Sequence, residues 1–229
     1  MFNRGKIFGG LELDYELDFV AHTPQFNSAD QNSYTFASSD IGDAHPDRMV
    51  VVAVSIRVTA LVTVGADVTL GGVSMNKIGS TYGFATTQLF WLKVPTGTAE
   101  DIVVTRDSTA TPEQCGIAVY SFNTPATAPL DSGQTQASGT NSIWVFNIEC
   151  ANGGVVIGAS VKSSSTAGTH VISWNGTDSA VEDTDAVSNS VRRMFGHVLT
   201  TEDKTTNDFN SNISGSGNHT VTVASFEGP

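Results

Sequence analysis

The chain has 229 residues, enough to bury one large core or two small ones. Charged residues make up only 15% of it, and its 22 glycines are typical of a turn-rich β protein rather than a helix bundle. The formal net charge of −12 argues against a surface that follows nucleic-acid phosphates, and no apolar run is long enough to span a bilayer. The first ten residues also lack the apolar core of a secretory signal.

Strand-like patterns follow one another along nearly the whole chain. Apolar and polar residues alternate in 15–22 and 32–38, whereas 49–58 is a continuous β-branched run. That run predicts a strand buried on both faces or in a sandwich core. Turn residues separate the remaining predicted strands, which are 66–72, 86–95, 101–106, 115–122, 142–148, 153–162, 169–176, 191–199 and 219–226. We therefore predict an all-β, antiparallel protein.

An internal repeat connects the two halves. The segments 116–125 and 220–229 share four residues at an offset of 104, including Phe122 with Phe226. The same offset places Val51 on Val155, and it aligns 68–72 with 172–176 and 90–94 with 194–198. Collinear matches in several segments predict pseudo-repeats at about 30–125 and 140–229, with Phe122 and Phe226 in equivalent core positions.

The repeat favours one architecture and leaves another open. Each half supplies strands with an apolar face, so the halves either pack on each other or each close a small sandwich. We favour a single jelly-roll-like antiparallel β-sandwich over 14–229 with a pseudo-two-fold repeat, preceded by an N-terminal arm at 1–13. Segment 101–105 finds no counterpart, because the polar stretch 200–219 occupies its place in the second half.

No residue pattern predicts catalysis, a cofactor or a metal site. The five histidines lack metal-site spacing, and His197 is expected to face solvent on a strand. Alternating carboxylates at 12–18 are too far apart for one calcium ion and instead suit a solvated edge. Cys115 and Cys150 fit best as buried free thiols, although the two could meet in space.

Three tryptophans are candidates for stacking against a sugar. Trp91, Trp144 and Trp174 all occur in otherwise apolar strands, which favours core packing for each. Trp174 is the best exception, because it directly precedes the turn at Asn175. The pair Trp174 and Asn175 is therefore the possible glycan-binding site.

Turns and strands follow one another in a fixed order over about residues 30–125. They are an alternating Y-T-F strand, an Asp-Arg turn, a poly-valine strand, a V-x-x-G-G-V turn, a V-P-T-G-T turn and a G-x-x-V-x-S strand, here 34–36, 47–48, 50–54, 68–73, 94–98 and 116–121. In these motifs the first half resembles a family of structural proteins of tailed bacteriophages. The family implies a jelly-roll-like sandwich in the virion and no catalytic residue.

The expected function is non-enzymatic. The leading hypothesis is a capsid-decorating (cement) protein that binds the major capsid protein or other virion subunits, ranked above a tail component. It is expected in the virion, assembled in the bacterial cytoplasm as a homo-oligomer, plausibly a trimer, without nucleic acid or membrane. The alternative is a carbohydrate-binding adhesin module of a tail or fibre. The arm residues expected to dock on the partner are Phe2, Arg4, Lys6 and Phe8.

Overall fold

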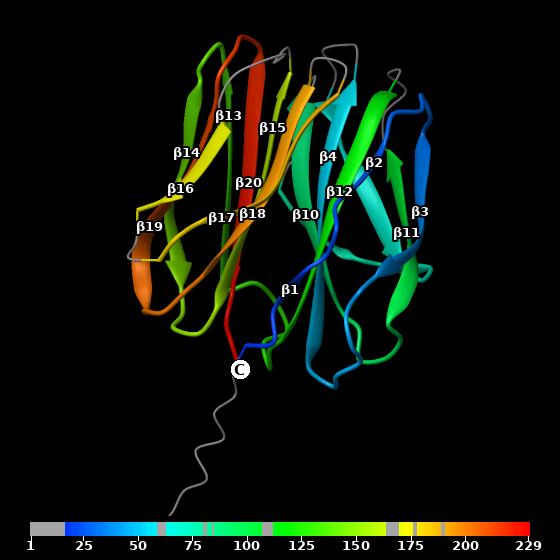
Figure 1. Cartoon of the computed structure of the whole chain (residues 1–229), viewed down its shortest axis with the longest axis vertical. Coiled ribbons are helices and arrows are strands. Elements are labelled where there is room, and N and C mark those ends of the chain that lie inside the picture. The colour runs from blue at the N-terminus through cyan, green and yellow to red at the C-terminus, as the bar shows by residue number, and fades with distance from the viewer. Residues whose placement is uncertain are drawn as a thin grey trace, which may run out of the picture.

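The computed structural model confirms an all-β, antiparallel chain (Figure 1). It describes residues 17–58, 63–79, 82–83, 85–106, 112–163, 170–175, 178–188 and 191–229, and within these ranges there is no helix. The strands are β1 Val20–Ala21, β2 Gln25–Asn27, β3 Ser33–Asp40, β4 Arg48–Val58, β5 Thr63–Val64, β6 Ala66–Leu70, β7 Val73–Ser74, β8 Asn76–Ile78, β9 Tyr82–Gly83, β10 Ala85–Lys93, β11 Ala99–Arg106, β12 Pro112–Asn123, β13 Asp131–Ser138, β14 Ser142–Cys150, β15 Val155–Ser163, β16 His170–Trp174, β17 Val181–Ser188, β18 Val191–Leu199, β19 Lys204–Ile213 and β20 Asn218–Phe226.

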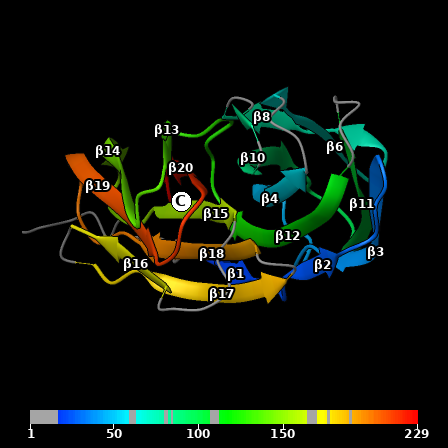
Figure 2. The same cartoon turned by 90° about the horizontal axis from the view of Figure 1, so that it is seen from above.

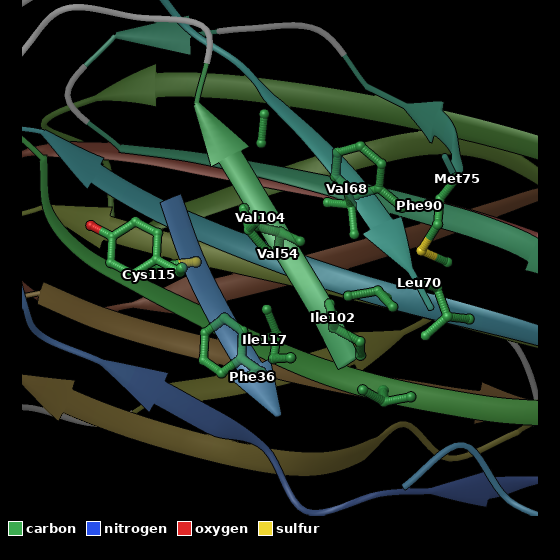
Figure 3. Packing of buried hydrophobic residues seen from close by; sticks show 14 of the residues in the cluster. Phe36, Val54, Val68, Leu70, Met75, Phe90, Ile102, Val104, Cys115 and Ile117 are labelled. Atoms are coloured by element: carbon green, nitrogen blue, oxygen red, sulfur yellow. The ribbon is translucent and has the colours of Figure 1, made fainter. Parts of the chain in front are cut away.

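The first half closes a sandwich of its own. A large sheet has the strand order β1-β12-β4-β10-β8, with β2 also paired to β12, and a smaller sheet has the order β3-β11-β6-β7. Their facing side chains form one buried cluster, which contains Phe36, Val54 and Val104. Figure 3 shows these residues turned into the common interior from the two sheets. This cluster is the first core.

The second half closes a second sandwich. Its large sheet has the order β13-β20-β15-β18-β17, and its small sheet has the order β14-β19-β16. Ile148, Trp174, Phe209 and Val223 belong to the buried cluster between these sheets, which is the second core. The two small sheets therefore lie on opposite flanks of the molecule, with the strands of the two large sheets between them (Figure 1).

The two sandwiches are joined face to face through their large sheets. A third buried cluster lies between them and is called the seam; it combines Met49, Val51, Ala53, Ile78, Leu89, Ala118, Tyr120 and Phe122 with Val155, Ile157, Ala159, Phe195, Ala224 and Phe226. Strand β4 illustrates why its sequence is continuously apolar. Val50 and Val52 face the first core, while Met49 and Val51 face the seam. The prediction of a strand buried on both faces is confirmed.

This arrangement corrects the preference for a single sandwich. Each half closes its own core, and the two halves then pack on each other, so both of the possibilities left open by the sequence are realised together. Figure 2, which looks along the strands, shows the two layered units side by side. The halves have matching strand orders: β12-β4-β10-β8 corresponds to β20-β15-β18-β17, and β3-β11-β6 corresponds to β14-β19-β16.

The polar stretch in the second half does form a strand, so the expectation that 101–105 has no counterpart is wrong. Strand β19 occupies the position in its sheet that β11 occupies in the first half. Its Phe209 is fully buried in the second core. Gly158 makes room for that ring, since a Cβ there would lie 2.3 Å from it. Phe209 and Ile213 are the two large apolar side chains of this otherwise polar strand, and both are fully buried.

Phe122 and Phe226 occupy equivalent places in the two ladders, as the repeat predicts. Phe122 lies opposite Met49, and Phe226 lies opposite Val155, so each pairs with a residue at the start of the central strand of its large sheet. Met49 of β4 is thus equivalent to Val155 of β15, whereas the sequence offset of 104 had placed Val51 on Val155, so the two strands correspond with a difference of two residues. A shift of two leaves every side chain on the same face, because strand side chains alternate with period two. The two rings also meet each other across the seam, with centroids 5.3 Å apart.

Candidate functional site

The arm residues expected to dock on a partner, Phe2, Arg4, Lys6 and Phe8, lie outside the described residues. The described chain begins at Leu17, which packs on the seam together with Phe19. The Phe19 ring lies 5.9 Å from the ring of Tyr120 in the first sandwich and 4.4 Å from that of His197 in the second. The segment that follows the arm is therefore in contact with both sandwiches.

A polar cluster beneath Phe19 links the two sandwiches. Tyr120 of β12 donates its hydroxyl to Asp183 of β17 at 2.9 Å, and Nδ1 of His197 on β18 lies 2.9 Å from the same carboxylate. Burial, reinforced by the Asp183 carboxylate, raises the pKa of Tyr120 well above its ordinary value. His197 is only 8% exposed, so the expectation that it faces solvent is wrong. Strand β18 turns the face that carries His197 toward the seam, and the alignment of the two halves does not predict this orientation.

Arg48 connects two of the turns that carry the phage-family resemblance. Its guanidinium donates hydrogen bonds to the carbonyls of Gly42 and Asp43, at 2.6 and 2.8 Å, and to those of Val94 and Thr96, at 2.7 and 2.6 Å. The side chain is 1% exposed. A planar five-donor group suits several fixed carbonyls at once. The Asp-Arg turn and the V-P-T-G-T turn thus depend on one another physically.

Each small sheet contains the same β-bulge. Ser38 on β3 and Asn147 on β14 are the two non-glycine residues with positive φ in the described chain, at 50° and 59°. The backbone N–H of Ser38 is bound by Asp101 at 2.8 Å, and that of Asn147 by Asp208 at 3.1 Å. An aspartate followed by a large apolar residue, on β11 and again on β19, is the sequence signal that could have revealed this correspondence.

The structure separates the members of the predicted glycan pair. Trp174 is 7% exposed and packs in the second core, so it cannot offer a ring face to a sugar. It holds the position of Leu70 in the first half, because Trp174 lies opposite Phe209 as Leu70 lies opposite Ile102. Asn175 is exposed and exchanges hydrogen bonds with Asp208: its Nδ2 donates to the carboxylate at 2.9 Å, and its Oδ1 accepts the Asp208 N–H at 2.8 Å.

The exposed tryptophan is Trp144, for which sequence reasoning favoured the core. Trp144 and Phe146 project from β14 on the side of the small sheet that faces away from the second core, and they are 37% and 61% exposed. Their ring centroids lie 6.2 Å apart and their planes differ by 13°. Strand β14 is an edge strand, paired only with β19. The two nearly parallel rings therefore form an apolar patch open to solvent, which is called the aromatic platform.

Amide and hydroxyl groups accompany the aromatic platform on the same face. Asn210 lies opposite Trp144 in the ladder and donates through Nδ2 to Ser142 Oγ at 2.6 Å and to the Ile143 carbonyl at 3.0 Å. Asn212, opposite Ser142, is exposed. Both oxygens of Asp208 are engaged, one by the Asn147 N–H and one by Asn175. The face thus combines two exposed rings with amide and hydroxyl groups and one carboxylate that is hydrogen bonded through both oxygens.

The cysteines and the metal-ligating residue types form no further candidate site among the described residues. Cys115 and Cys150 are both buried and free, and burial raises the pKa of the Cys115 thiol to about 12. Within the described ranges, no three His, Cys, Asp or Glu side chains are grouped so that they could hold a metal ion. The same part of the chain contains no helix with the length and apolarity needed to cross a membrane.

Fold and face together define a double β-sandwich with an exposed aromatic platform. No protein-family description matches the chain, and no curated protein matches it in sequence. Among solved structures, similarity is found to dimeric latent PorU from Porphyromonas gingivalis, with 7% identity and a TM-score of 0.29; the match covers 94% of this chain but only 22% of that one.

Two further structures resemble the chain over most of both lengths. PBSX exported protein XepA is 10% identical with a TM-score of 0.24, and the match covers 91% of this chain and 86% of that one. A structure of Cucumber Leaf Spot Virus is 11% identical with a TM-score of 0.20, covering 90% and 96%. Matches at this level assign the chain to no family.

Proposed function

We propose that the protein is a non-enzymatic structural component of a tailed-phage particle, a capsid-decorating (cement) protein that stabilises the shell through contacts with neighbouring subunits. Its proposed partners are the major capsid protein or other virion subunits, and it is proposed to act as a homo-oligomer, a trimer. The motif-level resemblance of the first half supports the phage assignment. The hydrogen bonds from Arg48 to the carbonyls of Val94 and Thr96, called the Arg48 clamp, add a physical reason for two of those motifs to occur together.

The observation that carries the docking role is the position of the segment after the arm. Leu17 and Phe19 are packed on the seam, where Phe19 contacts rings from both sandwiches. The arm, which precedes these residues in the chain, is therefore attached at a point that contacts both sandwiches. Load applied to the arm is then transmitted to the joined sandwiches rather than to a single edge strand.

The composition of the arm suits attachment to a partner. Phe2 and Phe8 offer apolar anchors, and Arg4 and Lys6 offer positive charges in a chain whose net charge is −12. Large aromatic side chains and Arg dominate the binding energy of many interfaces. The negative body keeps copies apart before assembly, because like charges repel at long range.

Removal of residues 1–10 tests the docking role. Phage particles produced with the shortened protein as the sole copy are expected to lose it, as measured by its abundance relative to the major capsid protein in purified virions. The isolated shortened protein is expected to unfold at the same denaturant concentration as the full chain, because the deletion leaves in place Leu17 and Phe19, which pack on the seam. Normal incorporation of the shortened protein would contradict the docking role of the arm.

A second variant separates docking from folding. Phe19→Ala keeps the arm but removes a ring that packs on the seam. This change should destabilise the body in the isolated protein, which the deletion of 1–10 should not. If both variants destabilise the protein equally, the arm is part of the folded body and the proposed mode of attachment fails.

A further inference from the structure

The internal repeat provides a reference for judging the aromatic platform. Phe36 lies opposite Ile102 as Val145 lies opposite Phe209, so Thr35 and Ala37 of the first sandwich correspond to Trp144 and Phe146 of the second. Both sandwiches carry the same bulge held by the same aspartate contact. Because the first sandwich forms this structure with a threonine and an alanine, the fold does not require the two rings.

The polar neighbours of the platform also differ from their counterparts. In the corresponding sheet of the first sandwich, Val103 lies opposite Thr35 and Thr105 lies opposite Ser33, where the second sandwich has Asn210 and Asn212. Aromatic rings and amides are thus concentrated on one outer face and are missing from its structural duplicate. Neighbouring exposed rings that the fold does not need are therefore a candidate interaction site.

The charges on the face restrict the ligand. No lysine or arginine occupies an outward position beside the rings among the described residues 142–146, 171–175 and 208–212, so nothing there attracts an anion. The one carboxylate within these ranges, Asp208, has both oxygens engaged by protein N–H groups. The face therefore suits an uncharged ligand that offers apolar C–H surface to the rings and hydroxyl groups to the amides.

The bulge argues against capture of a partner's strand. Regular pairing breaks between Val145 and Ile148, and Asn147 takes a left-handed conformation at that point. A strand added to this edge would need a continuous row of backbone donors and acceptors, which a bulge interrupts. From the rings, the amides, the lack of cations beside them and the broken edge, we propose that the outer face of β14, β19 and β16 binds neutral polysaccharide, with Trp144 and Phe146 stacking on sugar rings and the exposed amide of Asn212 bonding hydroxyl groups.

This inference moves the possible glycan site from Trp174 to Trp144 and is independent of the proposed role in the virion. The experiment uses the full-length purified protein in native gel electrophoresis, with the probes galactomannan, dextran and a soluble mixed-linkage β-glucan set separately into the gel. Retardation by at least one of these polymers is expected. The double variant Trp144→Thr/Phe146→Ala, which borrows the residues of the first sandwich, should lose at least tenfold in apparent affinity.

Two controls make the result specific. Val73→Thr removes an equally exposed apolar side chain at the β6–β7 turn of the first sandwich and should leave retardation unchanged. Asn212→Ala keeps both rings and should weaken binding severalfold. Circular dichroism and denaturant unfolding of each variant show that the fold is retained.

Three results would overturn the proposal. They are no retardation by any of the three polymers, retardation that survives in the ring double variant, and concentration-dependent dimerisation of the protein that the ring double variant abolishes. The last outcome would assign the platform to a second copy of the chain. None of these results depends on incorporation into particles, so they are distinct from failure of the arm-deletion experiment.

Discussion

The seam makes a quantitative prediction for the pair Phe122 and Phe226. The two rings are 1% and 0% exposed, and they meet edge to face at an interplanar angle of 61°. Truncation of a buried Phe to Ala costs about 3–5 kcal/mol in the free energy of unfolding. An edge-to-face pair adds about 0.5–1.5 kcal/mol beyond area burial. Each single alanine variant should therefore lose about 3–5 kcal/mol, and the double variant should lose about 0.5–1.5 kcal/mol less than the sum.

Urea unfolding of the wild type, both single variants and the double variant measures this coupling, with tryptophan fluorescence and circular dichroism as independent probes. Phe36→Ala combined with Phe226→Ala is the matched control, because Phe36 belongs to the first core and not to the seam. Those two changes should add within about 0.3–0.5 kcal/mol. If the seam pair is as additive as the control pair, the two rings share no energetic contact and the reasoning about the seam is refuted.

Two further predictions concern Arg48 and His22. Arg48→Lys keeps the charge but cannot reach four carbonyls, so it should lower the free energy of unfolding by at least about 2 kcal/mol; unfolding identical to the wild type would contradict the clamp. Burial lowers the pKa of His22 from 6.5, against the opposing effect of Asp40. The unfolded chain therefore takes up this proton first as the pH falls, and stability should decrease below about pH 6.5. Denaturant unfolding of His22→Gln between pH 5 and 8 should show a shallower decrease than the wild type, and an unchanged slope would contradict it.

Apolar runs predicted the central strands well, because a strand between two cores must be apolar on both faces. The sequences of β4 and β15 follow this rule, and almost every residue in them is buried. The same rule fails for β19. Its Asn207 and Ser211 are buried because they are hydrogen bonded, Asn207 to Cys150 Sγ at 3.1 Å and Ser211 to Ser160 at 2.8 Å. Hydropathy cannot register burial that is compensated by specific partners.

The candidate site was harder to predict than the fold. In β14, Ile143 and Val145 point inward while Trp144 and Phe146 point outward, so both faces of the strand are apolar and the alternation cannot identify the core face. The position of Trp174 before a turn suggested exposure, yet its place in the ladder directs it into the second core. Only the pairing with β19 distinguishes the two tryptophans. Comparison of equivalent rungs in the two halves then shows which residues the fold does not need.

The seam has a consequence for the origin of the chain. Each large sheet turns an apolar face toward the other, and equivalent residues, Phe122 and Phe226, contact one another there. A contact in which the same position from two copies meets itself is the hallmark of an isologous dimer interface. The two sandwiches therefore have the form of a homodimer whose subunits became covalently joined through the segment 124–130. Because the two halves of such a joined pair are separate stretches of sequence, equivalent positions can differ, as Trp144 and Phe146 on β14 differ from Thr35 and Ala37 on β3.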